Sequence, residues 1–375
     1  MKKQKLVALL LSMILSCNII TGCSGGGDNS ATSTDDTTAK AQDADEETQT
    51  TEDDVQAIIE KVEAMSEEER EEAFLKEEGS QRAVRINNSG AFCLGNMVLA
   101  DVLGYYEEEG LETELIRGGT TFVETLSAGQ VDLGGTHIAH ILKPTTNGLD
   151  VAYLGACNTG CQTFYVLSDS DAASLADLSG GIVGVSGGIG GPGHNIVLTM
   201  LAADGLSQDD YQFKDFDASQ LLVAMQNGEI AGALIPEQIG EKWYKEGAVK
   251  RIRSITFDED FAEDVCCIWG VNGTYLKENP VTCYKLARAI AKADTYMEEN
   301  TLEAVQLMME QDWLSGDANY IAEICEPYDM DCTSEQTERT LRKTVNGYRE
   351  LGIIDESIDT DTFMHTYWHP FTSIK

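Results

Sequence analysis

The sequence predicts an α/β fold of two lobes followed by a helical C-terminal segment, and three observations support this fold class. Short β-branched or apolar runs alternate with helical patterns from residue 84 to residue 255, which is typical of mostly parallel sheets flanked by helices. The alternation pauses near residues 167–180 and restarts, so two sheets are expected. From Pro280 onward only helical patterns follow.

The N-terminus has the pattern of a cleaved export signal. Three lysines precede an apolar run over residues 6–20, which is too short to span a membrane comfortably. The run ends at Thr21-Gly22-Cys23, which resembles the lipobox of bacterial lipoprotein signal peptides. The resemblance implies a signal peptide over residues 1–22, lipidation of Cys23 and a protein anchored to the extracytoplasmic face of the cell membrane. An ordinary secretory signal is the alternative.

Two acidic segments separate this signal from the globular body. Residues 23–54 are mostly Gly, Ser, Thr, Ala, Asp and Glu, a composition that cannot bury enough apolar surface to fold, so they are predicted to form a disordered tether. In residues 55–83 apolar side chains recur at helical spacing among the acids. This acidic helical segment is expected to be a solvated pair of helices at the edge of the tether, or a docking surface for a partner.

The body is expected to divide between lobe 1, formed by residues 84–170 with 265–375, and lobe 2, formed by residues 171–264. The chain has 26 basic and 64 acidic residues and a net charge of −38. Binding to phosphate backbones needs a basic surface, so a nucleic-acid partner is excluded. Nothing in the pattern calls for a second copy of the chain, and a monomer is expected.

The cysteines of the body indicate disulfides in an exported protein. Cys325 and Cys332 lie in a short loop and are predicted to be bonded, and Cys157 and Cys161 are candidates for a second bridge across a turn. Buried thiols without a bond are the alternative. Cys266 and Cys267 are adjacent on a predicted strand, where neighbouring side chains point to opposite faces, so their role stays open. No paired Cys-x-x-Cys spacing is present, and neither a metal nor a cofactor is expected.

A glycine-rich loop over residues 186–194 separates a predicted strand, 182–186, from a predicted helix, 193–203. Strand, glycine loop and helix start leave backbone N–H groups pointing outward beside the positive end of the helix dipole, which suits a small anion. The alternative is that the glycines only make a tight connection. The loop has no Gly-Lys-Ser/Thr, so it is not a P-loop.

Four stretches together resemble one protein family. They are Gly104-Tyr-Tyr-Glu-Glu-Glu-Gly110-Leu-Glu-Thr-Glu114, Leu126-Ser-Ala-Gly129-Gln-Val-Asp132-Leu-Gly134, Leu175 to Val185, and Ala224 to Ala233. This pattern is similar to the substrate-binding proteins of nitrate/sulfonate/taurine-type ABC importers, which also include binders of thiamine-precursor pyrimidines. The resemblance implies a two-lobed periplasmic-binding-protein fold with two crossovers (type II), and an ABC permease and ATPase as partners. In the second lobe Ala231 stands where the family pattern has an acid.

Ligand contacts are expected beyond the carboxyl ends of the strands, where open α/β sheets bind their ligands. The function expected from the resemblance is capture of a small anionic ligand of the sulfonate, taurine or nitrate class in the cleft between the lobes, without chemistry. The alternatives are a pyrimidine binder, or a pyrimidine-forming or thiol enzyme on the same fold. The predicted ligand-binding residues are Ser89, Gly90, Phe92, Thr136, His137, Asn158, Ser186, Gly187, Gly188, Gly191, His194 and Glu237.

Overall fold

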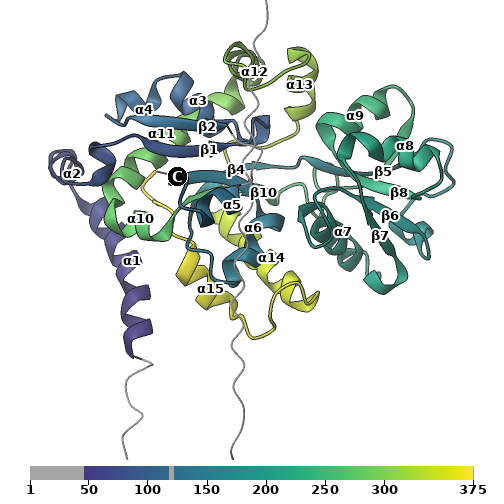
Figure 1. Ribbon diagram of the computed structural model, residues 1–375, viewed down its shortest axis with the longest axis horizontal. Coiled ribbons are helices and arrows are strands. Elements are labelled where there is room, and N and C mark those ends of the chain that lie inside the picture. The colour runs from purple at the N-terminus through teal and green to yellow at the C-terminus, as the bar shows by residue number, and fades with distance from the viewer. Residues whose placement is uncertain (1–45, 118–121, 375) are drawn as a thin grey trace, which may run out of the picture. The chain divides into compact units, whose positions relative to one another are not determined.

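A computed structural model describes residues 46–117 and 122–374, with side chains described from residue 55 onward. The predicted signal peptide, the lipidation site at Cys23 and most of the predicted tether lie outside the described residues. Within them the chain forms two five-stranded sheets with helices packed on both (Figure 1). The α/β class and the two-lobed periplasmic-binding-protein fold are confirmed.

The first sheet has the strand order β2-β1-β3-β10-β4. Three strands are parallel, and β10 enters between β3 and β4 antiparallel to both. The apolar run that begins at Val265 was expected to return to this sheet, and it does. The strands are β1 (Val84–Asn88), β2 (Thr113–Arg117), β3 (Leu133–His137), β4 (Ala152–Thr159) and β10 (Val265–Val271).

The second sheet repeats this plan with the order β7-β6-β8-β5-β9. Here β5 is the antiparallel strand, placed between β8 and β9. The chain therefore leaves the first sheet at residues 160–161, earlier than the crossing predicted at 167–180, and lobe 2 begins earlier than residue 171. The strands are β5 (Gln162–Leu167), β6 (Ile182–Val185), β7 (Gln212–Asp215), β8 (Gly232–Pro236) and β9 (Val249–Ser254).

The helices cover both sheets, and those after Pro280 pack on lobe 1. Helix α11 packs on α3, α4, α1 and α2, while α14 contacts β4 and β10. The helical C-terminal segment is confirmed. The helices are α1 (Glu46–Ala64), α2 (Glu67–Phe74), α3 (Asn96–Val102), α4 (Tyr105–Glu108), α5 (Phe122–Ser127), α6 (Ile138–Thr146), α7 (Pro192–Ala203), α8 (Leu221–Gln226), α9 (Glu237–Lys245), α10 (Gly273–Glu278), α11 (Pro280–Glu299), α12 (Thr301–Glu310), α13 (Ala318–Cys325), α14 (Ser334–Glu350) and α15 (Thr360–Tyr367).

The acidic helical segment is part of lobe 1, not the solvated pair that its charge suggested. Val55, Ile59 and Val62, spaced along one face of α1, are buried in the same core cluster as α3 and α11. Helix α1 already begins at Glu46, so the last residues of the predicted tether are helical. The buried carboxylate of Glu77 accepts hydrogen bonds from the backbone N–H groups of Val281 and Thr282, at 2.9 and 2.7 Å. These bonds cap the start of α11, where a negative charge is favourable.

No helix among residues 46–117 and 122–374 is long and apolar enough to cross a membrane.

Candidate functional site

The carboxyl end of β3 and the start of β10 lie side by side, because the two strands are antiparallel and Cys267 pairs with His137. The loop after β1, which contains Cys93, ends at this edge of the first sheet. The connection from β4 to β5 leaves from it as well. Four chain segments that are distant in sequence therefore bring polar and sulfur-bearing side chains to one place, as the strand-end rule predicts.

An imidazole and three thiols form a compact cluster at this edge, which we call the thiol–imidazole cluster. Its members are His137, Cys161, Cys266 and Cys267, whose ligand atoms all lie within 4.8 Å of one another. The Sγ of Cys266 is 2.9 Å from the Sγ of Cys161, 2.9 Å from Nε2 of His137 and 3.7 Å from the Sγ of Cys267. A fourth thiol, that of Cys93, lies beside Cys161 and Cys267.

Local backbone irregularities make this cluster possible. On a regular strand Cys266 and Cys267 would point to opposite faces, as the sequence predicted. The ladder between β10 and β4 instead has register shifts between Val265 and Cys267 and again between Cys267 and Ile268, and bulges of this kind re-aim side chains. Cys161 follows Gly160 with a φ of 99°, a left-handed conformation that is uncommon outside glycine.

The electrostatics keep the cluster neutral. Burial, with a smaller contribution from His140, lowers the pKa of His137 to about 4, so its imidazole is uncharged at neutral pH. Burial also raises the pKa of the Cys266 thiol well above its usual range, and hydrogen bonding to Cys161 raises the pKa of Cys267 to about 11. Cys266 beside His137 has the geometry of a nucleophile beside a base, but a thiol kept protonated is a poor nucleophile.

Glu237 lies next to this cluster at the start of α9 and is almost fully buried. Its carboxylate accepts hydrogen bonds from the hydroxyls of Thr163 (2.6 Å), Thr256 (2.7 Å) and Tyr328 (2.8 Å). Its backbone N–H donates to the carbonyl of Cys161. Burial raises the pKa of Glu237, against the effect of these hydroxyl donors. The Glu237 side chain therefore joins three parts of the chain: β5, the C-terminal segment and the return crossover, which is the connection from β9 to β10 over residues 255–264.

The glycine-rich loop adopts the predicted strand–loop–helix geometry, but the protein itself satisfies several of its donors. The Gly188 N–H donates to the carboxylate of Asp215 (2.8 Å), and the Gly190 N–H donates to Nδ1 of His194 (3.2 Å). The side-chain amide of Asn195 donates across the lobes to the Ala139 carbonyl (3.0 Å). An anion at this loop would have to compete with Asp215.

The loop's glycines are required by its backbone. Gly187, Gly188 and Gly190 have φ near +85°, a region that L side chains rarely adopt. At Gly191 a Cβ would lie 2.0 Å from the Gly187 carbonyl oxygen. Ser186 is half-buried and packs closely on Gly193. Three of the predicted ligand contacts, Gly187, Gly188 and Gly191, are therefore needed as glycines for the turn itself, whatever it binds.

A cavity opens between the lobes beside the thiol–imidazole cluster and encloses about 620 Å³, including space open to solvent. Its walls come from the start of α6, from α7, from the return crossover and from α14. Of the twelve predicted ligand-binding residues, His137 lines it. The other residues in its walls are Ile138, Ala139, Ile196, Thr199, Ile255, Phe261, Asp264, Val265, Cys266, Thr340, Lys343, Thr344, Gly347 and Tyr348.

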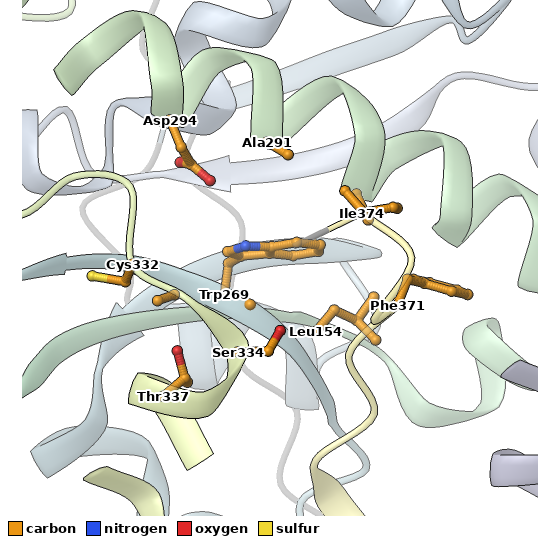
Figure 2. A pocket seen from close by; sticks show the side chains of 12 residues that line it. Leu154, Trp269, Ala291, Asp294, Cys332, Ser334, Thr337, Phe371 and Ile374 are labelled. Atoms are coloured by element: carbon orange, nitrogen blue, oxygen red, sulfur yellow. The ribbon is translucent and has the colours of Figure 1, made fainter. Parts of the chain in front are cut away.

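A second cavity lies inside lobe 1, around the indole of Trp269 (Figure 2). Figure 2 shows Asp294 and Ala291 of α11 on one side of the indole and Ser334 and Thr337 of α14 on the other. Trp269 is buried in the core, and Asp294 accepts a hydrogen bond from Asn96 (2.8 Å). None of the predicted ligand-binding residues lines this cavity, which makes it a packing feature of lobe 1.

The remaining predicted residues are spread along the strand-end edge. Phe92 is fully buried in the core, while Ser89 is exposed. Gly90 lies where a Cβ would be 2.8 Å from the Trp313 carbonyl oxygen. Thr136 contacts Nδ1 of His140 at 3.4 Å. Asn158 is fully buried, and its Oδ1 has no hydrogen-bond partner among the described residues.

Neither predicted disulfide is present, because all eight cysteines in the described part of the chain are free thiols. Cys325 and Cys332 are buried in different core clusters, and the Cys332 thiol donates to the Asp329 carbonyl. Cys161 contacts Cys266 instead of Cys157. Sequence proximity suggested the wrong partners because the fold brings together cysteines that are about a hundred residues apart.

Comparison with known proteins gives a consistent picture. Residues 93–304 match the sequence model of a family described as NMT1/THI5 like. The chain matches none of the curated proteins. Its fold is similar to that of the periplasmic aliphatic sulphonate binding protein SsuA from Escherichia coli, with 19% identity, a TM-score of 0.62, and coverage of 77% of this chain and 92% of that chain.

Two further solved structures show the same fold. The periplasmic nitrate-binding protein NrtA from Synechocystis PCC 6803 is 14% identical with a TM-score of 0.63, and the match covers 76% of this chain and 86% of that one. A mutant of DszB in complex with biphenyl-2-sulfinic acid is 14% identical with a TM-score of 0.55, over 75% of this chain and 95% of that one.

Proposed function

Because the chain belongs to the NMT1/THI5-like family, we propose that it is the solute-binding protein of an ABC importer. It captures a small ligand between its lobes and delivers it to the permease, which an ATPase subunit drives. The observation that carries the proposal is the cavity between the lobes, because α6 of one lobe and α7 of the other line it together. Closure of two lobes on a ligand excludes water and strengthens the polar contacts.

The ligand is an organic molecule with an anionic head, of the sulfonate or taurine class. In the walls of the cavity, the apolar side chains of Ile138, Ile196 and Phe261 offer an organic body more contact than nitrate could use. The loop over residues 186–194 leads into α7, and an anionic head that binds there takes the Gly188 N–H from the Asp215 carboxylate. The structures of a sulphonate binder and a nitrate binder with this fold support an anion. A thiamine-precursor pyrimidine is the alternative ligand.

A thermal-shift screen tests the proposal directly. Alkanesulfonates, taurine, nitrate and pyrimidines are added to the purified protein, and the true ligand raises the melting temperature because it binds only the folded state. Calorimetric titration then gives the affinity. Failure of every anion and every pyrimidine to shift the melting temperature would contradict the proposal.

The variant Asp215→Asn tests the position of the anionic head. It removes the carboxylate that the Gly188 N–H now binds, and with it the repulsion of an incoming anion. Affinity for the anion is expected to rise at least about fivefold, equivalent to about 1 kcal/mol. Asp217→Asn is the matched control, because it removes the same charge two residues away, from a side chain that makes no capping bond. Equal affinities in the wild type and Asp215→Asn would move the anion away from this loop.

Attachment to the membrane through Cys23 completes the proposed function, since a receptor held at the membrane stays near its permease. The Thr21-Gly22-Cys23 junction supports it. Cell fractionation checks this point: Cys23→Ala is expected to release the protein from membranes or to leave the precursor unprocessed. Unchanged size and unchanged membrane association of that variant would refute lipid anchoring.

A further inference from the structure

We propose that the thiol–imidazole cluster is a binding site for a borderline-to-soft transition metal ion, for which Zn²⁺ is the natural probe. The ligands are the thiolates of Cys161, Cys266 and Cys267 and Nε2 of His137. This Cys₃His set completes a tetrahedral coordination sphere of the kind that zinc occupies in structural sites. The site borders the cavity of the proposed function, with which it shares His137 and Cys266, but metal binding can be tested without the anionic ligand.

The spacing of the four side chains fits such an ion. Zinc–sulfur bonds of about 2.3 Å and a zinc–nitrogen bond of about 2.0 Å place tetrahedral sulfur atoms about 3.8 Å apart and sulfur about 3.5 Å from nitrogen. In the cluster, Cys266 and Cys267 have their sulfurs 3.7 Å apart, and the Cys161 sulfur is 3.7 Å from Nε2 of His137. The two separations of 2.9 Å need to open by less than 1 Å.

The side chain of His137 is presented as a ligand should be. Its Nε2 faces the sulfurs, 2.9 Å from that of Cys266 and 3.7 Å from that of Cys161. When Nε2 binds an ion, the ring proton is on Nδ1, so the Ala139 N–H that now lies 3.4 Å from Nδ1 turns away. Each thiol that binds the ion gives up its proton to solvent.

The site has an entry path and a second layer. His137 and Cys266 also line the cavity between the lobes, which is open to solvent, so an ion can reach them. The Cys93 thiol lies beside Cys161 and Cys267, where it helps to hold these ligands in place. Buried thiols that served only as apolar filling would not need to converge on one imidazole from two separate segments, the β4–β5 connection and the start of β10.

The position of the site gives the ion a mechanical role. Cys161 lies in the two-residue connection from β4 to β5, and Cys266 is the second residue of β10, directly after the return crossover. A metal that bonds to both sulfurs ties the two connections between the lobes to each other and to the end of β3. Metal binding is therefore expected to fix the hinge on which lobe closure depends.

The test uses the full chain, purified with reductant and stripped of metal. Titration with Zn²⁺ against a chromophoric chelator is expected to give one ion per chain. Co²⁺ is expected to give the thiolate charge-transfer and ligand-field bands of a tetrahedral sulfur site. Cys161→Ser and Cys266→Ser are each expected to weaken Zn²⁺ binding at least about 100-fold, since even loss of an outer partner costs about 10–100-fold.

Cys332→Ser is the matched control. It also replaces a buried cysteine, and its hydroxyl can still donate to the Asp329 carbonyl, so its Zn²⁺ affinity is expected to equal that of the wild type. Circular dichroism confirms that each variant is folded. Absence of Zn²⁺ binding by the folded wild type, or equal binding by the Cys161 and Cys266 variants, would overturn the proposal. A disulfide between Cys161 and Cys266, mapped in protein exported by cells, would also overturn it.

Discussion

Asp132 shows how a residue of the family pattern works in this fold. Its carboxylate is buried and accepts bonds from the guanidinium of Arg82 (2.6 Å), the guanidinium of Arg85 (2.7 Å) and the Arg85 backbone N–H (2.9 Å). The Asp132 side chain therefore holds the residue that precedes β3 against Arg85 of β1. In lobe 2 Ala231 stands at the matching position, and the nearby acid Glu229 makes only an exposed ion pair with Lys214. The motif acid of lobe 1 is structural.

Replacing Asp132 with Asn is expected to lower the free energy of unfolding by about 1.5–3 kcal/mol, the value of hydrogen bonds to a charged group. Burial raises the pKa of Asp132, but bonds from Arg82 and Arg85 outweigh it and the net pKa is lowered. A lowered pKa stabilises the fold above the pKa of the unfolded chain, and this stability is lost as pH falls through the folded value. The variant's deficit should therefore shrink in acid, which urea denaturation at several pH values measures.

Glu229→Gln is the control for that series, because it removes an acid of the equivalent segment whose ion pair is exposed, and exposed pairs stabilise little. If the two substitutions lowered the free energy of unfolding equally, the hydrogen bonds of Asp132 would stabilise the fold no more than an exposed ion pair does.

Single residues of the site could be predicted only where the local pattern determines them. The glycines at positions 187 and 188 were recognisable because a strand-to-helix loop needs positive φ there. His137 was recognisable because it follows a strand. Cys161, Cys266 and Cys267 were predicted with other partners or none, because their convergence depends on a bulge and on sheet pairing across a hundred residues. Neither the bulge nor this long-range pairing leaves a recognisable pattern in the sequence.

At the scale of elements, periodicity was a good guide to where strands and helices lie. The helical pattern predicted from Pro280 onward begins with α11, since Pro280 starts this helix and an apolar stripe runs along it. What periodicity cannot give is which sheet a strand joins. The sequence of residues 162–167 predicts a strand but does not indicate which of the two sheets it joins. Only its pairing with β8 and β9 places it in lobe 2.

The acidic helices illustrate the same limit. The apolar face of α1 was visible in the sequence, but α11, which covers it, lies more than two hundred residues away. Net charge suggested solvent exposure for a segment whose buried side is apolar. The fold shows that the exposed acids and the buried stripe belong to opposite faces of one helix.

At the scale of the whole molecule, Glu237 and the thiol–imidazole cluster occupy the point where both connections between the lobes meet. Gly160 lies in the first connection, and a Cβ there would be 2.7 Å from the ring of Tyr328. Tyr328 comes from the C-terminal segment and donates to Glu237 at the start of α9 in lobe 2. The C-terminal helices therefore do more than cover lobe 1, because the segment between α13 and α14 also supports the hinge.

Tyr328→Phe is expected to destabilise the protein by about 1–3 kcal/mol, because it leaves one oxygen of the buried Glu237 carboxylate without its donor.

Burial already raises the pKa of Glu237, and loss of a donor raises it further. A carboxyl group with a raised pKa supports the fold below its unfolded pKa, and this support is lost as pH rises through the folded value. The deficit of the variant should therefore grow as pH rises above the unfolded pKa of glutamic acid, as measured by urea denaturation at several pH values. Tyr275→Phe is the matched control, since the hydroxyl of Tyr275 is buried without a partner among the described residues, and its removal should cost little. A Tyr328→Phe deficit that is no larger than this control, or that shrinks as pH rises, would show that the hinge does not depend on the Glu237 network.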